Sequence, residues 1–190
     1  MNPCQEFFKI CAGDEVARLL QARSDAAAWE ELTASEHSPG PVQNSELVIR
    51  LVYHPIHVDA ETGDLKPSVI AEASSWGCSV QREVHCPVER AWKLGEDLAR
   101  ARSEANPGSP RKVHAIAVLE VAKLRSLITE GKRALGVYDT ALLENSAHAD
   151  IYVIVAGKKE GRSVRAQLFE WARQGIRGMP AGFDEPIAGR

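Results

Sequence analysis

Histidine side chains occur at two places in this chain where a strand is expected to meet a loop. The first is the segment 54–59, His-Pro-Ile-His-Val-Asp, which directly follows residues 47–53. Those residues are rich in β-branched side chains and predict a strand, so a rigid element would hold the loop. Imidazole transfers protons near neutral pH. His54 and His57 are therefore candidate catalytic residues; the alternative is that both lie in a surface loop.

The second place is the segment 145–150, Asn-Ser-Ala-His-Ala-Asp, which precedes the apolar run 151–156. Its small side chains leave room for the polar ones. Asn145 and Asp150 can orient the imidazole of His148 and fix which ring nitrogen carries the proton. The pattern predicts a catalytic histidine with two ligand-binding neighbours. A capped turn with an exposed histidine is the alternative.

Arg50 stands inside the first expected strand, between Ile49 and Leu51. A guanidinium in an apolar strand must pair with a carboxylate, face a cleft or lie on a solvated face. The alternation of side chains along a strand puts Arg50 and His54 on the same face. An arginine and a histidine on one face can hold a phosphate or another anion. Arg50 is therefore a candidate ligand-binding residue, with a surface ion pair as the alternative.

The two histidine segments would share one site if the loops that carry them meet at one edge of a sheet. This happens when the strand before the first segment and the strand after the second run antiparallel side by side. Such a cleft would bind a phosphate-bearing ligand, either a nucleotide or a nucleic-acid segment, and support histidine-assisted phosphoryl or glycosyl transfer. The side chains expected to form the cleft are Arg50, His54, His57 and His148.

A second function class is a non-catalytic module that binds another protein through residues 4–33. The first 64 residues contain four Lys or Arg against eleven Asp or Glu, whereas the remainder is net basic. An acidic helical segment of this kind can dock on a partner of opposite charge. The first function class requires the histidines to converge, and the second requires a wide apolar or acidic face on residues 4–33.

The composition limits the class of protein. The chain has 190 residues, of which 44% are hydrophobic and 26% charged, close to the average of soluble globular domains. No apolar run reaches the ~20 residues that a membrane-spanning helix needs. The N-terminus also lacks a basic stretch followed by an apolar one, as a secretion signal would have. We therefore expect a cytoplasmic protein without membrane contact.

The four cysteines, Cys4, Cys11, Cys78 and Cys86, contain no CxxC pair. Their spacing fits neither a zinc site nor a thioredoxin-like motif, so we expect free thiols and no metal site. The glycine patterns GxGxxG and GxxxxGK[ST] are absent from the sequence as well. The motifs therefore indicate no particular cofactor.

Hydrophobic periodicity predicts an alternation of helices and strands that belongs to the α+β class. The expected architecture is a mixed sheet of about five strands with helices packed on it. The expected helices are 4–33, 67–75, 87–105, 122–130 and 162–174, and the expected strands are 47–53, 78–84, 113–121, 134–138 and 151–156.

Turn-forming residues suggest how this architecture is divided. Residues 1–33 are expected to form an N-terminal helical appendage, and residues 34–45, rich in Ser, Pro and Gly, an exposed linker. The main domain would then span residues 46–174. Residues 175–190 contain four Gly and two Pro and are expected to be a loose C-terminal tail.

Overall fold

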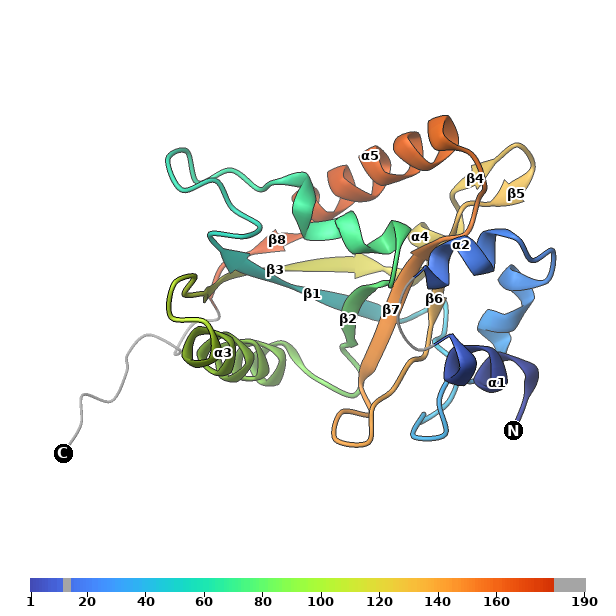
Figure 1. Ribbon diagram of the computed structural model, residues 1–190, viewed down its shortest axis with the longest axis horizontal. Coiled ribbons are helices and arrows are strands. Elements are labelled where there is room, and N and C mark those ends of the chain that lie inside the picture. The colour runs from blue at the N-terminus through green and yellow to red at the C-terminus, as the bar shows by residue number, and fades with distance from the viewer. Residues whose placement is uncertain (12–14, 180–190) are drawn as a thin grey trace.

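The computed structural model describes residues 1–11 and 15–179. Its centre is a six-stranded sheet in the order β6-β7-β2-β1-β3-β8, in which every neighbouring pair is antiparallel (Figure 1). The strands are β1 (Leu47–His54), β2 (Cys78–Arg82), β3 (Lys112–Glu120), β6 (Leu135–Tyr138), β7 (His148–Val153) and β8 (Ile176–Arg177). A separate hairpin consists of β4 (Ile128–Thr129) and β5 (Lys132–Arg133).

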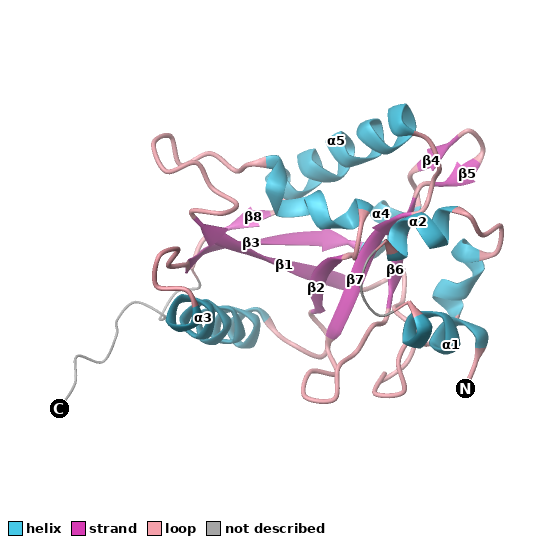
Figure 2. Cartoon of the chain, in the orientation of Figure 1, coloured by secondary structure: helices cyan, strands magenta, loops and turns pink. Residues whose placement is uncertain are grey.

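Helices cover both faces of this sheet (Figure 2). One face carries α5, η2 and α4, and the other carries α3 together with the three N-terminal helices. None of the helices in the described ranges is long and apolar enough to span a bilayer. The helices are α1 (Pro3–Ile10), α2 (Val16–Gln21), the 3-10 helices η1 (Ala26–Glu31) and η2 (Pro67–Ser74), α3 (Val88–Ala105), α4 (Val121–Arg125) and α5 (Lys158–Gln174).

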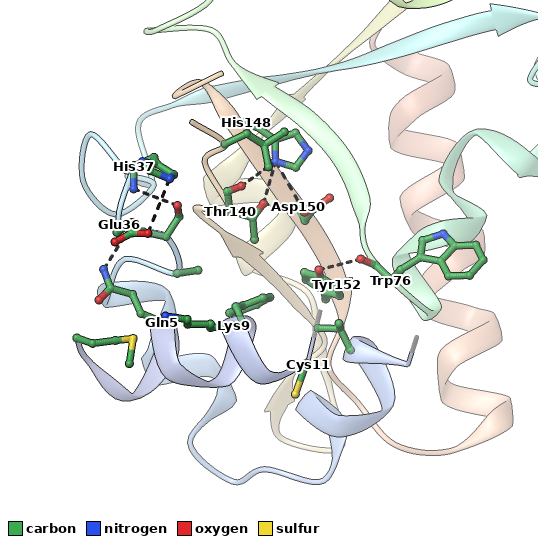
Figure 3. A pocket seen from close by; sticks show the side chains of 16 residues that line it. Gln5, Lys9, Cys11, Glu36, His37, Trp76, Thr140, His148, Asp150 and Tyr152 are labelled. Atoms are coloured by element: carbon green, nitrogen blue, oxygen red, sulfur yellow. Dashed lines mark hydrogen bonds and ion pairs between the residues drawn. The ribbon is translucent and has the colours of Figure 1, made fainter. Parts of the chain in front are cut away.

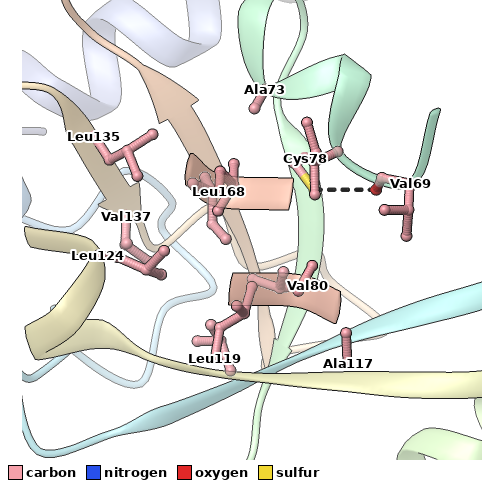
Figure 4. Close-up of a cluster of buried hydrophobic side chains, with 14 of the residues drawn as sticks. Val69, Ala73, Cys78, Val80, Ala117, Leu119, Leu124, Leu135, Val137 and Leu168 are labelled. Atoms are coloured by element: carbon pink, nitrogen blue, oxygen red, sulfur yellow. Dashed lines mark hydrogen bonds between the residues drawn. The ribbon is translucent and has the colours of Figure 1, made fainter. Parts of the chain in front are cut away.

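The main core lies between the sheet and α5 with η2. Strand alternation sends one set of apolar side chains to this face. Val80 of β2, Leu135 of β6 and Leu168 of α5 meet there and are at most 1% exposed (Figure 4). Burial of an apolar side chain of this size stabilises a fold by ~1.5–3 kcal/mol. This apolar layer therefore packs one face of the sheet against α5 and η2.

The opposite face of the sheet carries two smaller apolar clusters. In one, Trp92 of α3 packs against Ile116 of β3. In the other, the ring of Phe8 in α1 lies 5.4 Å from that of Tyr138 and 5.8 Å from that of Tyr152. Between the two clusters, Ser79 and Gln81 of β2 and His148 and Asp150 of β7 line cavities. This strip is where the candidate site forms.

The α+β class and the packing of helices on a sheet are confirmed. The sheet has six strands rather than about five, and its pairs are antiparallel rather than mixed. The helix expected over 122–130 ends at Arg125, because the chain turns there into the β4–β5 hairpin. Glu130 and Gly131 have positive φ angles of 53° and 74°, as the two central residues of a tight hairpin turn of type I′ require.

Residues 1–11 and 15–33 are packed into the fold instead of projecting from it. The carboxylate of Glu30 in η1 is buried and links this segment to residues 125–137. It accepts hydrogen bonds from Arg125 Nε at 2.7 Å, Arg133 Nη1 at 2.6 Å and the backbone N–H of Val137 at 2.7 Å. A single side chain thus ties η1 to α4, β5 and the edge strand β6.

The segment 34–45, expected to be an exposed linker, also lies against the sheet. Val42 is 2% exposed and belongs to the main core. The guanidinium of the buried Arg82 donates to the carbonyl oxygens of Gly40 at 2.6 Å and Pro41 at 3.3 Å. Turn-forming residues predicted the irregular backbone here, but an internal cation holds that backbone in place.

The expected C-terminal tail begins as a strand. Residues 176–177 form β8, which pairs with Ile116 and Ala117 of β3 at the sheet edge. The remainder of the expected tail from residue 180 onward lies outside the described residues.

Candidate functional site

Two cavities of about 780 and 740 Å³ occupy the face of the sheet between α3 and the N-terminal helices. We call the first the α3 lobe; its lining includes Ser79 and Gln81 of β2 and Leu94 of α3. We call the second the N-terminal lobe; α1, residues 34–37 and β7 contribute to its lining (Figure 3). His148 and Leu142 line both lobes. The two lobes are therefore adjacent, with His148 between them, and we refer to them together as the cleft.

The imidazole of His148 is fixed in one orientation and one tautomer. Its Nδ1 lies 3.0 Å from the backbone carbonyl oxygen of Thr140, which can only accept a hydrogen bond. In the neutral ring, Nδ1 therefore carries the proton and donates it to that oxygen, and Nε2 keeps a lone pair. Within the described residues, Nε2 makes no hydrogen bond. His148 thus places an unengaged proton acceptor at the junction of the two lobes.

Asp150 and Thr140 support this imidazole (Figure 3). Asp150 lies two residues after His148 on β7, so both side chains point to the cleft face of the sheet. The hydroxyl of Thr140 donates to Asp150 Oδ2 at 2.7 Å, and its oxygen lies 3.1 Å from His148 Nδ1. Asp150 Oδ2 is itself 3.9 Å from Nδ1. The carboxylate can therefore stabilise positive charge on the ring after the ring has accepted a proton.

Asn145 holds the loop in front of β7. Its backbone exchanges two hydrogen bonds of 3.0 Å with Leu142, which closes a tight turn. Its side-chain amide donates to Gln81 Oε1 at 2.9 Å, which anchors this turn to β2. Asn145 and Gln81 both line the α3 lobe. The amide thus shapes the lobe beside His148 rather than orienting the ring directly.

Arg50 lines the α3 lobe, but its guanidinium is already engaged within the protein. It donates from Nε to the carbonyl of Val69 at 2.9 Å, from Nη1 to that of Ser79 at 3.0 Å and from Nη2 to Glu72 at 2.7 Å. The pairing of β1 with β2 ends after Ile49. The guanidinium therefore bridges the gap where the two strands separate, and Glu72 balances its charge.

The two histidine segments do not converge, which corrects the prediction of a joint site. β1 and β7 are not neighbours, because β2 lies between them. Both run antiparallel to β2, so they run parallel to each other. Ile49 pairs with Gln81, which pairs with His148. His54 lies five residues beyond Ile49, or about 17 Å along β1, and it lines neither lobe.

His57 is a structural residue in this fold. It is 6% exposed, and its Nδ1 accepts a hydrogen bond from the backbone N–H of Tyr53 at 3.1 Å. Burial, together with the positive charge of Arg50, lowers the pKa of His57 to about 3. The ring is therefore neutral at physiological pH and uses its lone pair to hold the turn after β1.

Three residues of the α3 lobe were missed by reasoning from the sequence: Tyr53, Arg102 and Arg111. Arg102 lies in the last turn of α3, and Arg111 directly precedes β3. A signal was present in the sequence, because the two arginines flank the cluster of turn-forming residues 106–110. A tight connection there brings its two ends together.

Cys11 lines the N-terminal lobe, whereas Cys4, Cys78 and Cys86 line neither lobe. Cys4 and Cys78 are buried, and burial raises the pKa of the first to about 12 and of the second to about 11. A thiol with such a pKa is a poor nucleophile and a poor metal ligand at neutral pH. No group of three or more His, Cys, Asp or Glu side chains in the described part of the chain could hold a metal ion.

Comparisons with family models, with curated proteins and with solved structures found no match to this chain.

Proposed function

We propose that this protein binds a phosphate-bearing ligand, a nucleotide or a nucleic-acid segment, in the cleft and that His148 transfers a proton there. The observation that carries the proposal is the state of the imidazole. The carbonyl of Thr140 holds Nδ1, which leaves Nε2 to a ligand. A general base must lie within hydrogen-bond reach of the proton that it takes. His148 meets this requirement for a ligand in either lobe.

The chemistry that this arrangement supports is a transfer between two groups, one in each lobe. Nε2 takes the proton of an incoming hydroxyl group as that oxygen attacks, and the proton later passes to the leaving group. The imidazolium that exists between these steps is positively charged. The carboxylate of Asp150, 3.9 Å from Nδ1, stabilises that charge.

Charge in the α3 lobe supports a phosphate rather than a neutral ligand. Arg102 and Arg111 line this lobe and form no ion pair with any carboxylate of residues 1–11 and 15–179. Guanidinium groups match the oxygen geometry of phosphate. The cavity size also lies within the ~300–1,000 Å³ that small-ligand sites usually occupy.

The test replaces His148 with glutamine, which keeps a polar side chain but cannot transfer a proton. The purified protein is incubated with a panel of nucleotides, sugar phosphates and short oligonucleotides, and the products are followed by mass spectrometry. His148→Gln should lower the rate by about 100-fold, while the melting temperature stays near that of the wild type. The exposed His114→Gln serves as the matched control. Equal rates in wild type and His148→Gln would refute the proposal.

The other function class, a module that binds a protein through residues 4–33, has less support. The aromatic side chains of α1 pack inward, with Phe7 against Trp29 and Phe8 against the tyrosines of the sheet. A docking helix needs an apolar or charged face turned outward. The N-terminal helices use their apolar faces to form one wall of the cleft instead.

A further inference from the structure

One end of the α3 lobe is a cluster of cations around a phenol. Tyr53, Arg102 and Arg111 all line this lobe, and the charges of both arginines act on the phenol of Tyr53. Ser103 holds the cluster together: its hydroxyl donates to the carbonyl of Ala99 at 2.7 Å and accepts from the backbone N–H of Arg111 at 2.8 Å. The backbone of Arg111 is thereby hydrogen-bonded to Ser103 of α3, the residue next to Arg102. The two arginines are brought together by the fold and do not meet by chance.

The charge at this end is not compensated by described residues. Arg50, the third arginine of the lobe, is neutralised by Glu72. The remaining carboxylate of the lining, Glu144, lies in the turn beside His148 at the other end. Burial raises the pKa of Tyr53, and the nearby arginines oppose that rise. The phenol therefore keeps its proton at neutral pH and can donate it to an anion.

The cation cluster is far from His148. In the register of the sheet, Gln81 of β2 pairs with Ile49 of β1 on one side and with His148 of β7 on the other. Tyr53 lies four residues beyond Ile49, or about 13 Å along the strand. A hydrogen bond reaches only ~3 Å. A phosphate bound at the cluster therefore cannot also contact Nε2 of His148.

The surface between the two ends is largely apolar. Leu51 of β1 forms the floor, and Leu94 and Leu98 of α3 form the side wall. Leu98 is 43% exposed, so it can still bury surface against a ligand. An uncharged body that lies along this stretch would connect an anionic end at the cluster to a polar end at His148.

We infer that the α3 lobe takes a phosphomonoester whose phosphate is an anchor at Arg102 and Arg111, and whose reacting bond lies at the opposite end, beside His148. This inference rests on the proposed function and narrows it to one substrate class: phosphomonoesters with an extended uncharged body, such as a nucleoside monophosphate. The bond that changes is then in the body and is not a P–O bond. In a glycosyl transfer, the glycosidic bond breaks with its electron pair going to the leaving atom. The incoming hydroxyl oxygen forms the new bond and gives its proton to Nε2, which returns it to the leaving atom.

The first experiment locates the phosphate without relying on activity. Inorganic phosphate is titrated into the full-length protein, labelled so that arginine Nε–H and histidine ring resonances are visible by NMR. Phosphate should shift the Nε–H resonances of Arg102 and Arg111 and leave the ring of His148 unmoved. A shift of the His148 ring instead, or no saturable shift up to about 50 mM phosphate, would overturn the inference.

Variants assign the site to its residues. Arg102→Gln and Arg111→Gln should each weaken phosphate binding by about tenfold, as expected for the loss of one charge-assisted pair. Arg100→Gln is the matched control, because Arg100 lies on the same helix but pairs with Asp97 at the surface. Phosphate binding that is equal in all three variants and the wild type would contradict the assignment.

A third measurement separates this inference from the proposed function. Phosphate binding is compared in the wild type and in His148→Gln, and should be equal. If His148→Gln then has no effect on any reaction, the proposed function fails while the anchor stands. If a nucleoside monophosphate releases inorganic phosphate in a reaction that depends on His148, the proposed function stands while the anchor inference fails.

Discussion

Buried carboxylates of this protein differ in how well they are satisfied. Asp150 accepts a hydrogen bond from Thr140. Asp139, one residue before that threonine, is fully buried, and neither of its oxygens has a hydrogen-bond partner among the described residues. Arg82 Nη1 is 3.9 Å from Asp139 Oδ1. Burial raises the pKa of Asp139 to about 6, even though the charge of Arg82 opposes the rise.

The raised pKa predicts a stability that depends on pH. The pKa of Asp139 is higher in the folded than in the unfolded chain, so folding takes up a proton between the two values. The associated stabilisation is complete below pH 4 and is lost as the pH rises through 6. Urea unfolding should therefore find Asp139→Asn more stable than the wild type at pH 8, by roughly 2 kcal/mol. The difference should shrink at pH 5.

Asp64→Asn, at an exposed position, controls for the loss of one surface charge. A difference between wild type and Asp139→Asn that stays constant from pH 5 to pH 8 would show that Asp139 does not titrate in this range.

At the scale of elements, single side chains join segments that the backbone leaves apart. Arg50 bridges β1 and β2 where their pairing ends. Glu30 joins η1 to α4, β5 and β6. Because β6 is an edge strand, the bond from the N–H of Val137 to Glu30 also satisfies a group that would otherwise be free to pair with another chain. Arg50 thus holds together strands that floor the α3 lobe, and Glu30 fixes one of the N-terminal helices to the sheet.

The Glu30 link predicts a large effect from a small substitution. Glu30→Gln removes one charge and leaves Arg125 and Arg133 without their carboxylate. Removing one partner from a buried ion pair costs ~3–5 kcal/mol. Since Arg133 is 34% exposed and partly solvated, we expect a loss near the lower end, about 3 kcal/mol in urea unfolding. The neighbouring Glu31→Gln, on an exposed side chain, should change stability by less than about 0.5 kcal/mol.

At the scale of the whole molecule, the N-terminal helices complete both the core and the cleft. Their cluster buries the rings of Tyr138 and Tyr152. The same helices supply Gln5, Phe8 and Lys9 to the lining of the N-terminal lobe. A division of the chain into an appendage and a main domain therefore cuts through one apolar cluster and one cavity.

This packing predicts the outcome of limited proteolysis. Several residues of the segment 34–45 are exposed and can be cut, but the fragments should remain together in size-exclusion chromatography, because α1, α2 and η1 stay packed on the sheet. Deletion of residues 1–33 should expose apolar surface and raise the fluorescence of a hydrophobic dye. Release of a free N-terminal fragment, with residues 46–190 still folded, would contradict this expectation.

The sequence by itself determined the local features of this protein. Periodicity and turn-forming residues located β1, β3, β6 and α3 within one or two residues and assigned the α+β class, because these signals depend only on neighbours along the chain. His148 and Asp150 were grouped because they are close along the chain, in a loop expected before a strand at 151–156. The strand instead spans His148–Val153, so both residues lie in β7 and share its cleft face. Side chains two positions apart in a strand share a face wherever that strand lies in the sheet.

Only the tertiary structure decided which of these local groups meet. The position of β2 between β1 and β7 makes those two strands parallel, and so separates His54 from His148. It also engages the guanidinium of Arg50 with carbonyl oxygens of η2 and β2, whereas Arg102 and Arg111 line the α3 lobe without an ion pair to a described carboxylate. The physical reason is that strand order follows from the burial of apolar faces summed over the whole chain. Strand order therefore cannot be inferred from residues that are close together along the sequence.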